Sequence, residues 1–510
     1  MNLADIVEGH PDEAVALVAS DRTLTYGQLR AEVGAARGGL VRLGVRPDDR
    51  VALVLPNGWP FVVAYLAVLG VGAVAVPIDP SMPAPAVAQE IDMIRARVAI
   101  AGPAAEAVVR EVAQGRSGAT QLVVVGDMSE LLDADPVPYV DRRPDDLALL
   151  VFTAGTAGPA KAAMLTHGGL RANLDQVQQH PGRALVPNDV SYGVLPFFHV
   201  FGINVVLGLS LLAGSSVVLV ERFDAAEALA IIRERRVTIL AGAPPMFRAL
   251  AAASPGEGSG RGDGDGPPGG DLASVRLAVS GASALPPEVA AAFEDRFGLP
   301  LWQGYGLTEA SPVVTSSVIG GVPKPGSVGV PLPGVKLRLV DEAGEDALVS
   351  DPGELWVKGP NVFAGYWEDP EATAAVLTDG WLHTGDVAVV DDDGYVYLVD
   401  RLKDIVIVSG FNVYPAEVED VLRDDPRVDE VAVVGVADAH TGESVRAYVV
   451  ATADAAGDPG LVDTLAARCR AHLAPYECPD AIEIVDSLPH GLGGKLLRRA
   501  LRQGSTGPPR

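Results

Sequence analysis

From its start to about residue 285, the chain alternates between two textures of hydrophobic and polar positions. Short runs rich in Val, Ile and Leu are separated by Ala- and Leu-rich stretches long enough to form helices. The apolar runs are RVALVLP, AVAVPI, VAIAG, QLVVVG, SSVVLV, VTILAG and RLAVSG. Continuous apolar runs between helical stretches are typical of buried parallel strands joined by crossover helices. The pattern therefore predicts an α/β fold with two α/β layered subdomains.

Between residues 329 and 398 the pattern changes to strands separated by turns: VKLRLVDEAG, GELWVKG and GDVAVVDDDGYVYLVD. This predicts a small antiparallel, β-barrel-like subdomain. The remainder contains two further strands, VDEVAVVGV and AYVVATA, then the helical VDTLAARCRAHL and a final strand in IEIVDSL. We expect an N-terminal domain over residues 1–400, a hinge at 401–403 in the polar joint RLKD, and a smaller mobile α+β domain over 404–510.

Two kinds of segment could mislead this division. Residues 254–270, SPGEGSGRGDGDGPPGG, contain too few apolar residues to pack and predict a mobile surface insertion. The apolar runs that begin at Phe61 and Val205 approach the length of a membrane span. Each run breaks at glycine or serine, so we expect a buried helix followed by a buried strand and no integral membrane span.

Composition narrows the possible settings and partners. The 510 residues carry a formal charge of −27, which repels nucleic-acid backbones and anionic membranes, so we expect no nucleic-acid partner. The N-terminus lacks a positive region followed by an apolar core, and Cys469 and Cys478 match no zinc or redox spacing. These features predict a cytoplasmic protein with structural cysteines. They do not indicate an oligomeric state.

Lysine is scarce, with six lysines among 39 basic residues. Three of the six, Lys161, Lys403 and Lys495, lie in segments suited to nucleotide chemistry. A lysine ammonium is compact and mobile enough to follow a phosphate, whereas arginine presents a rigid planar fork. The alternative is that the positions of these three lysines are accidental and carry no functional meaning.

The first of these segments is LLVFTAGTAGPAKAAMLTHGG, an apolar strand, a Gly- and Thr-rich loop and a helix from Gly168 onward. Amides at Gly155 and Gly158 can face phosphate oxygens, the hydroxyls of Thr153 and Thr156 can donate to them, and Lys161 adds charge. The lysine spacing differs from that of the common phosphate loop, GxxxxGK[ST]. Taken alone, a glycine-rich turn is often only a turn.

A second segment, GYGLTEAS, begins at Gly304. Gly304 and Gly306 permit a close approach to a ligand, Tyr305 can stack on a base, and Thr308 offers a hydroxyl. The carboxylate of Glu309 is suited to Mg²⁺. The alternative is a turn in which Thr and Glu cap a helix.

Two later segments complete the set. WLHTGDVAVVDDDGYVYLVDRLKDIVIVSGFNVYPAEVED supplies Asp386 after a turn, Arg401 beside Lys403, and a second turn at Gly410. LPHGLGGKLLRRAL places Lys495 on a glycine-rich loop. Taken singly, Asp386 is also consistent with a turn acid and Lys495 with a surface charge.

Together, in this order and at these separations, the four segments resemble the acyl-adenylate-forming superfamily of acyl-CoA synthetases, peptide-synthetase adenylation domains and luciferases. The resemblance runs from TLTYGQLR at Thr23, through PFFHVFG at Pro196 and VSGASAL at Val279, to Lys495. The stretch DRLKDIVIVSGFNVYPAEVE is most similar to bacterial fatty-acyl-CoA ligases, or long-chain fatty acid–CoA ligases.

The resemblance implies specific roles. The segment from Thr153 to Lys161 would hold the β- and γ-phosphates, and Lys495 would reach the α-phosphate and the substrate carboxylate during adenylation. Lys403 would be the hinge about which the C-terminal domain rotates, exchanging Lys495 for the Gly410 turn at the pantetheine entry. The implied cofactor-binding residues are Thr153, Gly155, Thr156, Gly158, Lys161, Gly304, Tyr305, Gly306, Thr308, Asp386, Arg401, Gly410 and Lys495.

The implied catalytic residues are Lys495, Thr308, Glu309 and His199, with Glu309 as the Mg²⁺ ligand. His199 would lie near the reacting carboxylate, and a packed core histidine is the equal alternative. The implied acyl pocket is apolar and consists of Phe197, His199, Phe201, Gly281, Ala282 and Trp302.

The chain departs from the family pattern at two places. The phosphate loop usually reads TSGTTGxPKG, whereas this chain has Ala154, Ala157, Ala160 and Ala162. Two hydroxyl donors are missing, each worth about 1.5–3 kcal/mol at a charged partner, so we expect weakened ATP affinity. Glu477 stands in PYECP where relatives usually carry lysine, which predicts weaker coenzyme A binding or a face that coenzyme A does not use.

The sequence thus predicts an ATP-, Mg²⁺- and coenzyme A-dependent acid–thiol ligase for a medium- or long-chain fatty acid, releasing AMP and pyrophosphate. Two alternatives stay open. One is transfer of the acyl group to a carrier protein, and the other is a degenerate homologue that binds acyl groups or nucleotides with little turnover.

Overall fold

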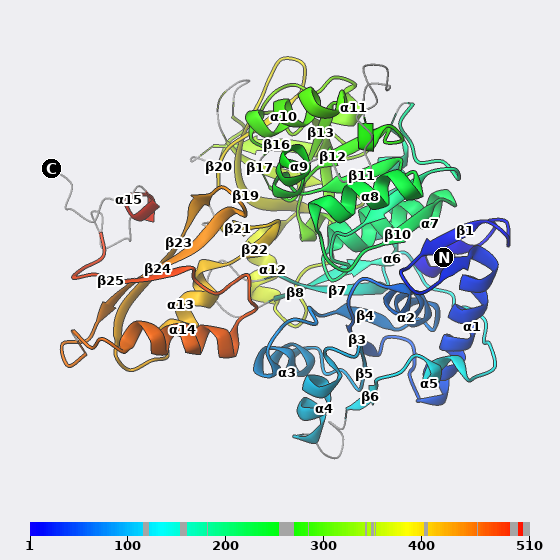
Figure 1. Cartoon of the computed structure of the whole chain (residues 1–510), viewed down its shortest axis with the longest axis horizontal. Helices are drawn as coiled ribbons and strands as arrows, with labels where there is room; N and C mark the ends of the chain where they lie inside the picture. The colour runs from blue at the N-terminus through cyan, green and yellow to red at the C-terminus, as the bar shows by residue number, and fades with distance from the viewer. Residues whose placement is uncertain are drawn as a thin grey trace.

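The computed structural model describes residues 1–115, 122–153, 161–180, 182–253, 270–283, 285–341, 344–347, 351, 353–401, 406–455, 457–489 and 498–502. The phosphate loop 154–160, the hinge Lys403 and Lys495 lie outside these residues, as does all of the predicted insertion except Gly270. Figure 1 shows a large body that contains the N-terminus, with a smaller body beside it that carries the C-terminus.

A six-stranded sheet forms the first α/β unit, in the order β6-β5-β3-β4-β7-β8. Its strands are parallel except for the last pair. The strands are β3 (Arg50–Val54), β4 (Val74–Pro77), β5 (Val98–Ala101), β6 (Val123–Val125), β7 (Leu147–Thr153) and β8 (Lys161–Thr166). The apolar residues of the central strands are buried on both faces, because helices cover both.

One face of this sheet packs with α1 (Tyr26–Arg42) and α2 (Trp59–Gly70), and the other with α3 (Ala84–Met93) and α4 (Glu106–Gln114). Short η1 (Leu3–Val7) and α5 (Ser129–Leu132) pack beside α2 and α1 respectively. The chain begins α1 with a capping box, in which Thr25 accepts from Gln28 N and the Gln28 side chain accepts from Thr25 N.

A nine-stranded sheet forms the second unit, in the order β15-β14-β13-β12-β11-β9-β10-β1-β2. The six strands from β13 to β1 are parallel to their neighbours, and both edges are antiparallel. The strands are β1 (Val15–Val18), β2 (Thr23–Thr25), β9 (Val190–Gly193), β10 (Ser216–Leu219), β11 (Ile239–Gly242), β12 (Leu277–Ser280), β13 (Leu301–Gly306), β14 (Val313–Ser316) and β15 (Val330–Pro331).

Helices again cover both faces of this sheet. On one side lie α8 (Ala225–Arg235), α9 (Pro244–Ala252) and α10 (Pro287–Phe297). On the other side, a shared core with the first unit contains α6 (His167–Gln178), the π-helical η3 (Phe201–Gly208) and α7 (Leu209–Ala213). The remaining short elements are η4 (Gly270–Leu272), η5 (Thr308–Ala310) and α11 (Ser317–Gly320).

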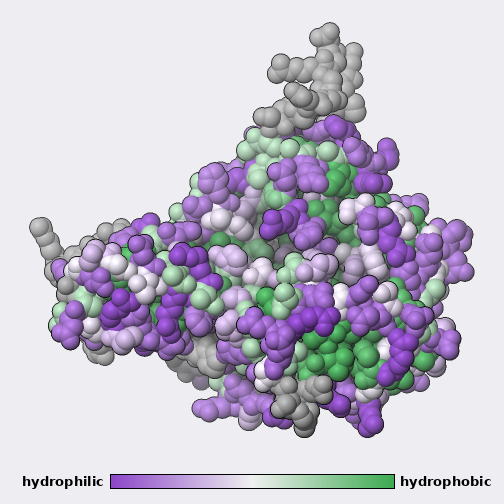
Figure 2. Space-filling view, turned by 60° about the horizontal axis from the view of Figure 1, so that its bottom comes forward, coloured by the Kyte–Doolittle hydropathy of each residue, from purple (hydrophilic) through white to green (hydrophobic). Residues whose placement is uncertain are grey.

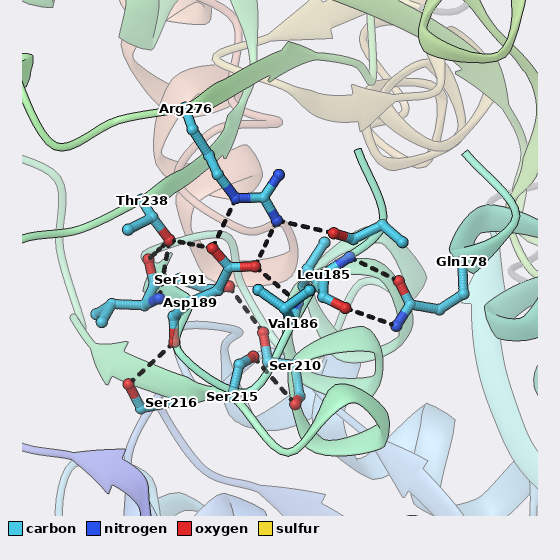
Figure 3. A network of polar contacts seen from close by, with 12 residues as sticks. Gln178, Leu185, Val186, Asp189, Ser191, Ser210, Ser215, Ser216, Thr238 and Arg276 are labelled. Carbon is cyan, nitrogen blue, oxygen red and sulfur yellow. Dashed lines mark hydrogen bonds and ion pairs between the residues drawn. The ribbon is translucent and has the colours of Figure 1, made fainter. Parts of the chain in front are cut away.

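A buried ion pair fixes the starts of three strands of this sheet (Figure 3). Asp189, 3% exposed, accepts two hydrogen bonds from Arg276 and one from the Thr238 hydroxyl. It also accepts from Val186 N at 2.8 Å. The pair ties the segments that lead into β9, β11 and β12, so it sets where these strands begin.

The antiparallel region forms a five-stranded sheet. Its strands are β16 (Lys336–Val340), β17 (Gly353–Lys358), β18 (Leu377–Thr378), β19 (Trp381–Val390) and β20 (Val396–Arg401), with α12 (Pro370–Val376) before β18. Asp386 on β19 lies opposite Arg401 on β20.

The C-terminal body is a second five-stranded sheet with helices, drawn in orange and red in Figure 1. Its elements are β21 (Val406–Val408), β22 (Phe411–Val413), α13 (Pro415–Arg423), β23 (Val428–Asp438), β24 (Gly442–Ala451), α14 (Leu461–His472), β25 (Ala481–Ile484) and α15 (Arg498–Arg502). One face packs on α13 and α14, and the other on Leu501 of α15. Cys469 and Cys478 are both free thiols.

These elements confirm the predicted fold class: a large N-terminal α/β part and a smaller C-terminal α+β part. The two long apolar runs are broken as expected, since α2 is followed by β4 and α7 by β10. Among the described residues, no helix has both the length and the apolarity to cross a membrane.

One expectation about local structure is wrong. The sequence predicted a loop that contains Lys161, but residues Lys161–Thr166 form β8. The helix expected from Gly168 onward is present as α6, which begins at His167. The run KAAMLT contains few residues with strand preference. Antiparallel pairing with β7 stabilises it as a strand, from Thr153 opposite Lys161 to Leu147 opposite Thr166.

Candidate active site

Tyr305 and Asp386 meet although 81 residues separate them. Tyr305 is the last residue but one of β13, and its hydroxyl donates to Asp386 Oδ2 on β19 at 2.6 Å. Gly306 follows in a tight hairpin, where a Cβ would lie 2.2 Å from the Pro312 carbonyl oxygen. The second sheet and the antiparallel region therefore bring an aromatic ring and a carboxylate to one place.

Glu309 follows Tyr305 by four residues, in the short η5 turn. Its Oε1 accepts a hydrogen bond from the Tyr366 hydroxyl at 2.6 Å. Burial, and then the neighbouring Glu309 carboxylate, raise the pKa of Tyr366, so the phenol stays protonated and donates. The Lys161 ammonium lies 5.4 Å from the centre of the Tyr366 ring. Tyr366 thus links the predicted metal-binding carboxylate to the predicted phosphate-binding lysine.

Backbone pairing explains how residues 363–367 reach this position. Ala364 N donates to Met164 O, Met164 N donates to Gly365 O, and Trp367 N donates to Ala162 O. The segment therefore extends the first sheet beyond β8. Ala162, which the sequence placed in the phosphate loop, is a buried residue of β8.

Thr153 and Thr308 supply the hydroxyls that the structure describes at this end of the site. Thr153, 9% exposed, ends β7 and donates weakly to the Lys161 carbonyl at 3.5 Å. Thr308 begins η5 and is half-buried. Gly304 precedes Tyr305 on β13.

His199 lies where the large and small bodies meet. Its ring centre is 4.8 Å from that of Phe198 and 5.3 Å from that of Phe411, on β22 of the C-terminal body. Burial lowers the pKa of His199 to about 4, so the imidazole is neutral at pH 7. Its Nε2 is buried without a hydrogen-bond partner among the described residues.

The Gly410 turn occupies the same junction. Gly410 has φ +87°, and a Cβ there would lie 2.9 Å from the Cβ of Ala243. The Arg248 guanidinium donates to the Ala439 carbonyl at 2.7 Å, a second contact between the bodies. The structure thus brings the turn at Gly410 and Phe411 beside Ala243 and His199.

The predicted acyl-pocket residues fall into two groups. A Cβ on Gly281 would lie 3.0 Å from the Phe201 ring, and Phe197 is fully buried 5.4 Å from Phe61. Ala282 follows Gly281 with φ +67° and is exposed. Trp302 packs in a different cluster, with Ile239, Leu277 and Val318, under the Arg183 guanidinium.

Several predicted residues lie outside the described part of the chain. They are Gly155, Thr156 and Gly158 of the phosphate loop, the hinge residue Lys403 and the catalytic lysine Lys495. The backbone of Arg401 is described and pairs with Asp386, whereas its side chain is not.

Two residues that sequence reasoning missed support the site. Tyr366 gave no signal, because nothing in the sequence relates it to a carboxylate 57 positions earlier. Asn57 did give one, since it is a polar residue just beyond the carboxyl end of buried β3. Its amide donates to the carbonyls of Gly193, Leu195 and Val220 and accepts from Phe197 N, so it fixes the backbone that carries Phe197 and His199.

An apolar cavity of about 390 Å³ lies elsewhere, at the carboxyl ends of β3, β5 and β6. Its lining contains none of the predicted site residues and one charged side chain, Asp127. Figure 2 shows hydrophobic residues gathered in one area of a mostly hydrophilic face. The lining that the structure describes contains no cationic side chain that could bind a phosphate or a carboxylate.

The described residues thus include a Tyr305 ring bonded to a carboxylate, the Glu309 carboxylate beside a protonated phenol and a lysine, and a neutral histidine at the junction of the two bodies. Such groups can position a polyphosphate and an apolar acid without any protein nucleophile.

Comparison with known proteins agrees with this chemistry. A model of AMP-binding enzymes matches residues 3–367, and a model of the AMP-binding enzyme C-terminal domain matches residues 417–495. A feruloyl-CoA synthase of Amycolatopsis sp. is 38% identical over 96% of both chains. A long-chain-fatty-acid–CoA ligase of Yersinia pestis is 34% identical over 90% of this chain and 86% of its own.

Among solved structures, the amide bond synthetase McbA from Marinactinospora thermotolerans is similar with a TM-score of 0.86, at 31% identity over 99% of both chains. Fold and relatives define the class as AMP-forming ligases that join an acid to a thiol. The chain belongs to the AMP-binding enzyme family. The resemblance predicted from its motifs is confirmed, and enzymes of this class use ATP and coenzyme A.

Proposed function

We propose that this protein activates a medium- or long-chain fatty acid as its acyl-adenylate and transfers the acyl group to coenzyme A. The observation that carries the proposal is the meeting of Lys161, Tyr366 and Glu309, the last of which lies four residues along the chain from Tyr305, which pairs with Asp386. These groups come from three sheets, and together they suit the three parts of a nucleoside triphosphate: base, ribose and phosphates.

In the first half-reaction, the fatty carboxylate attacks the α-phosphorus of ATP and pyrophosphate leaves. Tyr305 would stack on adenine, Asp386 and Arg401 would bind the ribose hydroxyls, and Thr308 would contact the α-phosphate. Thr153, Lys161 and the loop between them would bind the outer phosphates. Lys495 would stabilise the charge that develops as the carboxylate attacks.

Glu309 fits a Mg²⁺ role. Tyr366 donates to only one of its oxygens, so the other can face a cation, and Mg²⁺ in nucleotide sites commonly takes one or two carboxylates together with phosphate oxygens. When bound, the ion neutralises phosphate charge. Tyr366 would hold the carboxylate in place for it.

The second half-reaction joins the acyl group to the coenzyme A thiol and expels AMP. The contact of the Gly410 turn and Phe411 with Ala243 and His199 supports an arrangement suited to this step, in which the C-terminal domain lines the acceptor entry. A neutral His199 beside the entry leaves the thiol and the adenylate without a competing positive charge. We also propose that Lys403 is the hinge about which the C-terminal domain rotates, and that the protein acts in the cytoplasm.

Ferulate is a second candidate acid, because the Amycolatopsis relative is named a feruloyl-CoA synthase and matches the whole length. The apolar, aromatic group of Phe197, Phe201 and Gly281 suits an alkyl chain or a ring equally. The acid must therefore be identified by experiment.

The test is AMP release coupled to a spectroscopic readout, with fatty acids of six to eighteen carbons, ferulate and cinnamate, each with coenzyme A. We expect turnover to be highest with a fatty acid of medium or long chain. A maximum with ferulate would replace the fatty acid by an aryl acid. Lys495→Ala is the control, and should lose adenylation while it retains thioester formation from supplied acyl-adenylate.

Two further arms test the alternatives. A holo carrier protein replaces coenzyme A in one arm, and a primary amine in the other, because McbA is an amide bond synthetase. Binding of MgATP by calorimetry without AMP release for any acid or acceptor would mean a degenerate homologue and would refute the proposed activity.

A further inference from the structure

Four carboxyl side chains meet where the C-terminal body packs against the first α/β unit. Asp79 follows β4 and Glu90 lies on α3, while Glu417 lies on α13 and Glu477 follows α14. Asp79 is 6% exposed and Glu90 is 8% exposed. Helices α3 and α14 are in contact across the boundary. The cluster is therefore interdomain, with two acids from each side.

These carboxyls have few partners for their charge. Asp79 Oδ1 accepts from Ser81 N and from the Ser81 hydroxyl, both at 2.8 Å, and Glu477 accepts from Ala474 N at 2.7 Å. Asp79 Oδ2 is buried without a hydrogen-bond partner. Within the described ranges, no basic side chain forms an ion pair with any of the four, and no group of acids has the arrangement of a metal site.

Among the described residues, the groups that shift the titration of the cluster are acidic or neutral. Glu90 faces Glu417, Glu477 and Asp79, and Glu417 also faces Asp420 on its own helix. The phenol of Tyr476 completes the set. Like charges brought together and removed from water cannot all remain ionised, so docking requires protons.

Burial, reinforced by the neighbouring carboxyls, shifts the titration of the cluster upward. It raises the pKa of Glu417 to about 8 and that of Glu477 to about 7, and it raises the pKa of Glu90 well above the ordinary range. It also raises the pKa of Asp79, while Ser81 and Tyr476 oppose the shift.

An aromatic stack joins this cluster to the acceptor side of the active site. The Tyr476 ring lies 4.4 Å from the Phe411 ring, with 21° between their planes, and Phe411 lies 5.3 Å from His199. Tyr476 is the neighbour of Glu477 in the chain. A change in how the acids dock therefore moves the residues that contact His199.

We propose that Asp79, Glu90, Glu417 and Glu477 are positioning residues for the thioester-forming half-reaction, because they dock the C-terminal domain only after taking up protons. The inference deepens the proposed two-step function and rests on it. It also gives Glu477 a place: the face where it replaces the usual lysine is an interdomain surface, where its charge is neutralised.

The direction of the pH effect follows from linkage. An undocked glutamate in water has a pKa near ~4.3, so docking takes up a proton at each residue whose pKa rises. Docking is favoured at low pH and is lost as pH rises through the values in the docked state. For each proton taken up, the ratio of docked to undocked enzyme falls about tenfold per pH unit.

Glu90→Gln and Glu417→Gln test the idea, singly and together, since glutamine keeps the shape and removes the charge. The matched control is Glu111→Gln on neighbouring α4, an exposed acid outside the interface. Thioester formation from supplied acyl-adenylate and coenzyme A is measured from pH 6 to 8. Taking the ratio of variant to wild-type rate cancels the ionisation of the thiol, which affects both alike.

We expect this ratio to rise up to about tenfold per pH unit for each single variant, more steeply for the double variant, and to stay flat for Glu111→Gln. Pyrophosphate exchange, which reports the first half-reaction, should show no such trend. If no acid supports pyrophosphate exchange, the proposed function is refuted. The spin-label distance between the two bodies then remains as the test of docking.

Domain position is followed directly with spin labels at Arg248→Cys and Ala439→Cys, two residues in contact across the boundary. The background carries Cys469→Ala and Cys478→Ser. The label distance should lengthen between pH 6 and 8 in otherwise wild-type protein and change less in the double glutamine variant. A distance that does not respond to pH, or a flat ratio of rates, overturns the proposal.

Discussion

At the scale of single residues, the site depends on hydrogen bonds between side chains that are distant in the sequence. Tyr366→Phe removes the hydroxyl that donates to Glu309 at 2.6 Å. A hydrogen bond to a charged group is worth about 1.5–3 kcal/mol, so kcat/KM for MgATP in the adenylation step should fall about 10- to 150-fold. Pyrophosphate exchange at several Mg²⁺ concentrations measures it.

Tyr397→Phe is the matched control, because its phenol also faces a carboxylate, Asp391, at 3.3 Å in the antiparallel sheet. It should leave adenylation within about twofold, the range of ordinary surface changes. Unchanged adenylation in Tyr366→Phe would show that Glu309 needs no help from the phenol.

The sequence predicted the residue types of the site better than their partners. Gly306, Tyr305, Glu309 and Lys161 could be proposed from the sequence because their chemistry is local: a tight turn, a ring, a carboxylate and a charge near glycines. The Tyr305–Asp386 and Tyr366–Glu309 contacts could not be predicted from spacing, since tertiary folding joins different sheets to make them.

At the scale of secondary-structure elements, the strongly apolar strands were predictable and the weakly patterned ones were not. Strands β3, β4, β5 and β11 are continuous apolar runs because both faces of their sheets are covered. Strand β8 was missed because its pairing with β7, rather than its composition, makes it a strand. Helix η3 was expected as a helix, but its π-type hydrogen bonding carries no signal in the apolar pattern.

The Asp189–Arg276 pair gives a prediction about the second sheet. Arg276→Met leaves the nearly buried Asp189 carboxylate with only Thr238 and Val186 N as donors. Removing one partner of a buried pair costs about 3–5 kcal/mol, and because Arg276 is one-third exposed we expect about 2–3 kcal/mol less stability at pH 7. Urea unfolding followed by tryptophan fluorescence measures it.

The sign of its pH dependence follows from the same contacts. Burial alone would raise the pKa of Asp189, but the hydrogen bonds from Arg276, Val186 and Thr238 outweigh it and lower the pKa. The pair's contribution is therefore present above about pH 4 and is lost as pH falls through the folded-state pKa. The difference between wild type and Arg276→Met should shrink toward pH 3. Arg233→Met, at a more exposed pair with Asp271, should show a smaller difference at every pH.

At the scale of the whole molecule, the two bodies meet beside His199, and Phe411 is one of the side chains at this junction. Its ring lies 5.3 Å from the His199 ring and 6.2 Å from the Phe198 ring, both of which belong to the large body. Each aromatic pair contributes about 0.5–1.5 kcal/mol beyond the area it buries. Phe411→Ala should therefore shift the docking equilibrium toward the undocked state by about 1–3 kcal/mol, which is roughly 5- to 150-fold.

The two half-reactions should separate in this variant. Thioester formation from supplied acyl-adenylate should fall by up to that factor, while pyrophosphate exchange should stay near the wild-type rate. The reason is that Phe411 belongs to the C-terminal body and, among the described residues, has no ring pair or hydrogen bond with Glu309 or Asp386. Arg248→Ala is the control, since it removes an exposed interdomain hydrogen bond to Ala439 and should lower thioester formation only a few-fold. Equal loss of both half-reactions in Phe411→Ala would mean that Phe411 supports the fold of the site as a whole, and that the contact between the two bodies is not specific to acyl transfer.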